Sequence, residues 1–146
     1  MLGVARSPHM KTLLLLILAS VLSFHTFAAD TIPPDLVGEW ASPDAKFSRE
    51  LLTRGGALYL GTNGFAAVFG APPPIGMAGT ATYDPKTFTL TLDLRDKGTP
   101  PEVLKITITY DPKAKTLTTK PTPGVQKGTF TRRGKAIPKW VLDETK

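Results

Sequence analysis

The chain has 146 residues, of which 41% are hydrophobic, and it carries a formal net charge of +6 and no cysteine. This length corresponds to one domain. The lack of cysteine excludes disulfide bonds, thiolate nucleophiles and zinc–thiolate sites. The only histidines, His9 and His25, lie in the N-terminal leader. Catalytic arrangements that need histidine or cysteine therefore cannot be built from the rest of the chain.

The N-terminal part of the chain has the pattern of a secretory signal. An apolar run at residues 13–24 follows Lys11, and small residues come after it, ending the leader at Ala28. The run is shorter than the roughly 20 apolar residues that a spanning helix needs. We therefore expect a cleaved signal peptide over residues 1–28, not a membrane span, and a periplasmic or secreted domain over residues 29–146.

After the leader, short segments rich in β-branched, aromatic and leucine residues alternate with glycine and proline, which is typical of strands and turns. The segments predict nine strands, near residues 37–42, 47–53, 57–61, 65–70, 78–83, 88–94, 102–110, 115–120 and 128–133. The alternation is clearest in the sixth and seventh strands, where a period of two places one set of side chains in the core. That inward set is predicted to be Phe88, Leu90, Leu92, Leu94, Leu104, Ile106, Ile108 and Tyr110. The other face of each strand is polar, which favours an antiparallel sheet.

Turn residues link these strands into hairpins. Asn63-Gly64 lies between two apolar runs, which is a strong hairpin signal. The segment at residues 83–91 recurs at residues 110–118, and each copy contains Asp-Pro, a pair suited to the start of a type I turn. Arg54-Gly55-Gly56 predicts a further turn.

Two long connections and one short helix complete the prediction. Three successive prolines in the loop at residues 71–76 lack N–H donors and cannot join a ladder. The second long loop covers residues 95–101, and residues 138–144 are the one candidate for a helix in a chain that otherwise lacks helical periodicity. Because the hairpins follow one another along the chain, we expect an all-β, small antiparallel meander barrel of about eight or nine strands, which closes its own edges.

The start of the first strand carries a motif. Gly38-x-Trp40, followed by a meander of hairpins, resembles the lipocalin-like (calycin-type) small β-barrels, and in particular the compact bacterial lipocalin-like domains. The resemblance implies that Trp40 closes one end of the barrel and that Arg132 or Arg133, on the last strand, packs over its ring. The chain is shorter than full lipocalins and lacks their disulfide, which argues against a deep ligand cavity.

The hairpin at residues 58–69 is apolar on both faces. One face can meet a ligand or partner, or the N- or C-terminal segment can cover it, residues 138–142 being the first candidate. A gap between bulky and small barrel walls is a further possibility, expected near Ala67. The predicted ligand-binding residues are Tyr59, Phe65, Ala67, Phe69, Leu92 and Ile106, and the predicted structural residues are Gly38, Trp40 and Arg132.

The remaining chemistry is limited. Residues 29–146 contain no phosphate-binding loop and no calcium loop, so we expect no cofactor and no metal site. Paired carboxylates could hydrolyse a glycoside, but we interpret the four strand and loop candidates as solvated charges. These are Glu39, Glu50, Asp93 and Glu102. We therefore do not expect an enzyme.

Charge is distributed unevenly. Residues 97–146 hold 11 basic and 4 acidic side chains, whereas residues 29–96 hold 5 and 8. The excess of basic side chains in residues 97–146 is consistent with an anionic surface as a partner, and equally with a surface that only keeps the protein soluble. Nucleic acid is not expected for an exported chain.

Two functions follow as hypotheses. The first is an exported, non-enzymatic binding module for an apolar or amphipathic small molecule. The alternative is a periplasmic protein-interaction module, such as an inhibitor or immunity protein, that acts through the loops at residues 71–77 and 95–101.

Overall fold

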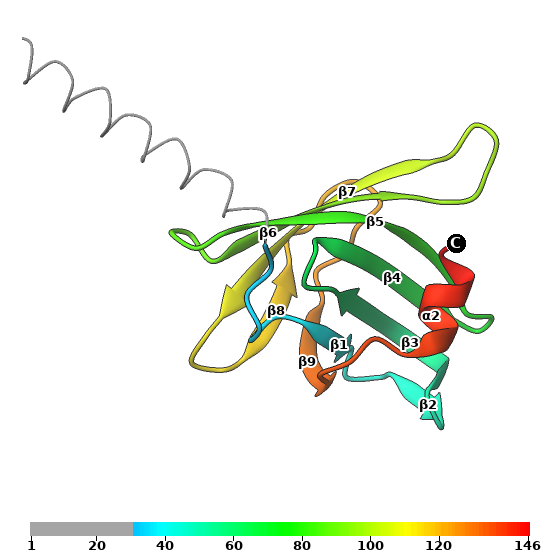
Figure 1. The fold of residues 1–146 in the computed structure, drawn as a ribbon, viewed down its shortest axis with the longest axis horizontal. Helices are drawn as coiled ribbons and strands as arrows, with labels where there is room; N and C mark the ends of the chain where they lie inside the picture. The colour runs from blue at the N-terminus through cyan, green and yellow to red at the C-terminus, as the bar shows by residue number, and fades with distance from the viewer. Residues whose placement is uncertain (1–30) are drawn as a thin grey trace, which may run out of the picture.

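The computed structural model describes residues 31–146, so the predicted signal peptide lies outside the described residues. Eight strands form a closed antiparallel barrel, and a ninth short strand lies beside it (Figure 1). The strands are β1 (Gly38–Ala41), β2 (Lys46–Ser48), β3 (Leu51–Leu60), β4 (Phe65–Ala71), β5 (Ile75–Asp84), β6 (Thr89–Arg95), β7 (Val103–Asp111), β8 (Thr116–Thr119) and β9 (Thr129–Gly134). One short helix, α2 (Lys139–Glu144), follows them.

Consecutive strands from β3 to β9 are neighbours, and β1 closes the ring by pairing with both β9 and β3. This confirms the all-β meander barrel. Closure gives each barrel strand two partners and so removes the exposed edges that Thr-rich strands would otherwise present. Within residues 31–146, no helix has the length and apolarity needed to cross a membrane.

The second and third strands differ from the prediction. Arg54-Gly55-Gly56 does not turn the chain, because these residues lie inside the long strand β3. Gly55 has a φ of +78°, and near it β3 exchanges its partner β2 for β1. A Cβ at Gly55 would collide with the backbone of Ala45, so the close approach of the β1–β2 connection explains the glycine.

The fifth strand also differs, because it begins three residues earlier than predicted. Gly70 pairs with Ile75, so only the three prolines between β4 and β5 remain unpaired. The loop is therefore no longer than the prolines require, and the residues on both sides of it continue the ladder of β4 and β5.

The repeated turns form as predicted. The carboxylates of Asp84 and Asp111 accept hydrogen bonds from the backbone N–H groups of Lys86 and Lys113, each at 2.9 Å. Phe88 ends the first turn with a φ of +53°, and its side chain is 42% exposed. The prediction that Phe88 points inward is therefore wrong, because the left-handed residue that closes the turn precedes the regular alternation of β6.

The barrel interior is filled by side chains from two unequal walls. The wall formed by β6 and β7 is bulky, with Leu92 opposite Ile106 and Leu94 opposite Leu104 in the register. The wall formed by β4 and β5 is small: Ala66 and Ala81 are buried in the same cluster. Bulky residues against small ones give a packed core.

One end of the barrel is closed by the segment that precedes β1. Leu36 and Trp40 are 1% exposed, and the Trp40 indole donates a hydrogen bond to the Leu36 carbonyl at 3.0 Å. The Arg132 guanidinium donates to the carbonyls of Pro34, at 3.1 Å, and Val37. Trp40 and Arg132 together therefore hold the N-terminal segment against this end.

Candidate functional site

The apolar hairpin is covered on its outer face. Tyr59, Ala67 and Phe69 point away from the barrel interior and form a second buried cluster with Val141 of α2. The Trp140 ring meets Phe69 edge-on, with centroids 4.9 Å apart. Figure 1 shows α2, in red, lying against β3 and β4.

A hydrogen bond also holds α2 in place: the Trp140 indole donates to the backbone carbonyl of Glu50, which directly precedes β3, at 2.7 Å. The C-terminal segment thus occupies the face that the sequence left open to a ligand, a partner or the chain itself. Apolar residues on both faces of the hairpin are explained by packing on both sides.

The predicted ligand-binding residues consequently divide between two places. Tyr59, Phe65, Ala67 and Phe69 belong to the outer cluster under α2. Leu92 and Ile106 belong to the interior core. The structure does not bring these residues together into one site, and Ala67 does not face the interior where a gap was expected.

A buried ion pair borders the outer cluster. Glu39 is only 2% exposed, and its carboxylate accepts a hydrogen bond from Arg133 at 2.5 Å. Within residues 31–146, Glu39 Oε2 and the Tyr59 hydroxyl have no hydrogen-bond partner of good geometry. Burial, followed by the nearby charge of Glu39, raises the pKa of Tyr59 above its ordinary value. The interpretation of Glu39 as a solvated charge is therefore wrong.

The two candidate arginines have different contacts. Arg132 is opposite Trp40 in the β1–β9 register, and its guanidinium donates hydrogen bonds to carbonyls of the N-terminal segment. Arg133 does place its guanidinium over an aromatic ring, but the ring is that of Phe47 and not Trp40, with its centroid 3.7 Å away. Each arginine thus joins β9 to a segment near the start of the domain.

The end of the barrel away from Trp40 opens into an apolar pocket of about 320 Å³, which we call the mouth. Its walls are Val68, Met77, Leu94 and Leu104, with Ile75 at the edge. Val68, Met77 and Leu104 are half-buried, whereas Leu92 and Ile106, one layer deeper, are buried. Core side chains therefore remain accessible at the mouth.

The two long loops meet at the mouth. Gly76 and Met77 line it from the start of β5, directly after the proline loop, and Asp96 and Glu102 line it from the loop between β6 and β7. Asp96 also organises its own loop, because its carboxylate accepts hydrogen bonds from the N–H groups of Gly98, at 3.0 Å, and Glu102, at 2.8 Å. Both ionisable side chains that line the mouth are acidic.

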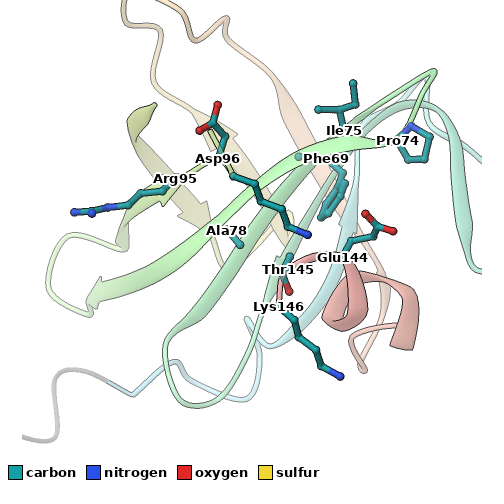
Figure 2. Close-up of a pocket in the computed structure, with 11 residues that line it drawn as sticks. Phe69, Pro74, Ile75, Ala78, Arg95, Asp96, Glu144, Thr145 and Lys146 are labelled. Carbon is teal, nitrogen blue, oxygen red and sulfur yellow. The ribbon is translucent and has the colours of Figure 1, made fainter. Parts of the chain in front are cut away.

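A larger pocket of about 530 Å³ lies between the end of α2 and the same two loops (Figure 2). Phe69, Ile75 and Ala78 supply its apolar surface. Figure 2 shows Glu144 and Thr145 on the helix side of this space and Arg95 directed away from it. Its charged lining residues are of both signs: Arg95, Asp96, Lys97, Glu144 and Lys146.

The carboxylates considered for hydrolysis are dispersed. Glu39 and Glu50 line one surface pocket, but Glu39 is already paired with Arg133. Asp93 lies on β6 and Glu102 at the mouth. In the part of the chain that the structure describes, no three His, Cys, Asp or Glu residues are grouped to hold a metal ion. Comparison of the chain with protein-family models, curated proteins and solved structures gives no match.

Proposed function

We propose that the protein is an exported, non-enzymatic binding module that holds a small apolar or amphipathic molecule at the mouth of its barrel. The observation that carries the proposal is the apolar pocket of about 320 Å³ lined by half-buried core residues. Its volume is near the lower end of the roughly 300–1,000 Å³ of typical ligand pockets. A compact molecule fits this space better than a long chain does.

The resemblance to lipocalin-like barrels supports this reading. The chain forms a closed eight-stranded meander, Trp40 is buried at one end, and the other end is open. The packed core below the mouth limits the depth that a ligand can reach. The proposed ligand therefore lies on the layer formed by Leu94 and Leu104, above Leu92 and Ile106.

The charge at the mouth defines the ligand further. Asp96 and Glu102 are its ionisable lining residues, and they repel an anionic headgroup. We therefore propose a neutral or cationic amphipathic ligand in preference to a fatty acid.

Calorimetric titration with octylammonium, 1-octanol and octanoate tests the proposal. We expect saturable binding of the first two and weaker binding of octanoate. Leu104→Gln should abolish the heat, because it places an amide in the apolar wall. Val103→Gln is the matched control, since Val103 is 55% exposed on the opposite face of β7. Absence of heat from all three compounds, or equal loss in both variants, contradicts the proposal.

A protein partner is the second candidate. Ile75 is 69% exposed and Val103 is 55% exposed, and they are the first residues of β5 and β7, directly after the two loops. Exposed apolar side chains at loop edges favour a partner surface. Native mass spectrometry of protein purified from its own host separates the candidates, because it shows either a small adduct or a second chain.

A further inference from the structure

The barrel end that Trp40 closes carries a separate pocket of about 350 Å³. Strand β6 starts at the repeated turn on this side and ends at the loop that borders the mouth, so the two pockets lie at opposite ends of the barrel. We call this second pocket the aromatic cup. Four of its lining residues are aromatic: Trp40, Tyr83, Phe88 and Tyr110.

The sequence repeat builds the cup. Tyr83 and Tyr110 occupy equivalent positions in the two copies, as do Phe88 and Lys115, and all four line the pocket. Phe88 and Lys115 have φ values of +53° and +55°. A left-handed conformation costs an L-residue about 1–2 kcal/mol, which glycine avoids. In this conformation both side chains contribute to the lining of the pocket.

The cup combines ring surfaces with donor groups. The rings of Trp40 and Tyr110 meet edge-on, with centroids 6.3 Å apart, an arrangement that a further aromatic ring can extend. Within residues 31–146, the hydroxyls of Tyr83 and Tyr110 make no hydrogen bond, and Lys115 forms no ion pair. These groups can all donate to an oxygen acceptor.

The charge of the cup is opposite to that of the mouth. Lys115 and Arg132 are its basic lining residues, and Asp35 is acidic. Arg132 Nε is buried and has no hydrogen-bond partner among the described residues. An anionic group on a ligand would gain from this excess of positive charge.

We propose that the aromatic cup binds a small aromatic carboxylate. The ring packs against Phe88 and the two tyrosines, beside the buried Trp40, and the carboxylate accepts hydrogen bonds from Lys115 and from the tyrosine hydroxyls. The site is independent of the mouth, because no lining residue is shared between the two pockets.

Titration of the ¹⁵N-labelled protein with 1-naphthoate, followed by NMR, tests this proposal. We expect saturable shifts in the two repeated turns and around Trp40. Lys115→Met should weaken binding about fivefold or more, which corresponds to about 1 kcal/mol. Lys113→Met is the matched control, since Lys113 is an exposed lysine of the same turn outside the cup.

1-Naphthamide has the same rings without the charge, and it should bind more weakly than the acid and respond little to Lys115→Met. Three results overturn the proposal: no saturable shift with 1-naphthoate, shifts confined to the mouth, or equal weakening by the two lysine variants. Equal affinity for the acid and the amide overturns it too, because the carboxylate would then not be recognised.

Discussion

Replacement of Trp140 by alanine should destabilise the protein by about 3 kcal/mol, at the lower end of the usual range for a large aromatic residue. Because the Trp140 side chain is only half-buried, the loss of stability should stay below the upper end of that range. The substitution still removes the ring contact with Phe69 and the hydrogen bond to the Glu50 carbonyl. Helix α2 has six residues and cannot persist without such packing. The outer cluster of Tyr59, Ala67 and Phe69 would therefore be uncovered.

Urea unfolding followed by circular dichroism measures the change, and binding of a hydrophobic dye reports the exposed cluster. Leu142→Ala is the control, because Leu142 is 42% exposed on the same helix and should cost under about 0.5 kcal/mol. A Trp140→Ala midpoint shift worth less than about 1 kcal/mol, with no rise in dye fluorescence, would refute the role of α2 as the cover of this face.

Three further predictions concern other parts of the chain. Trp40→Ala should cost about 3–5 kcal/mol in urea unfolding, because the ring is 1% exposed and bonded to Leu36; a loss under about 1 kcal/mol would contradict its closing role. Above pH of about 10, the unfolded chain releases the Tyr59 proton while the folded chain retains it, so the free energy of unfolding should fall by up to about 1.4 kcal/mol per pH unit. Tyr59→Phe should remove that part of the slope, and an unchanged slope would count against the raised pKa. N-terminal sequencing of exported protein should begin at Ala29 or Asp30, whereas an intact leader in the membrane fraction would disprove cleavage.

Local chemistry was sufficient to predict the hairpins. Asp84 and Asp111 bond to their own turns, and Asn63-Gly64 joins two strands, because such turns depend on a few adjacent residues. Gly55 shows the limit of this reasoning. Its left-handed conformation and close approach to Ala45 serve an exchange of strand partners, which adjacent residues do not reveal.

The candidate site was less predictable, because it depends on contacts between distant segments. Apolar residues on both faces of the 58–69 hairpin left open whether the outer face is buried or meets a ligand or partner, and the C-terminal segment was among the candidates for the cover that the structure shows. The sequence did not reveal that Tyr59 and Leu92 lie on opposite sides of the barrel wall. Nor did it place Asp96 and Glu102 at the mouth, since the two loops approach each other only in the folded chain.

Closure of the ring between β1 and β9 has a consequence for the order of folding. Glu39 pairs with Gly134, so the first barrel strand lacks one neighbour until β9 has been made. Contacts so distant in sequence form late and slow the folding of β-proteins. A growing chain can form its central hairpins early, but it cannot complete the barrel before β9 is available. If the leader directs export, this delay keeps the chain open for translocation, and the barrel closes after the last strand has arrived.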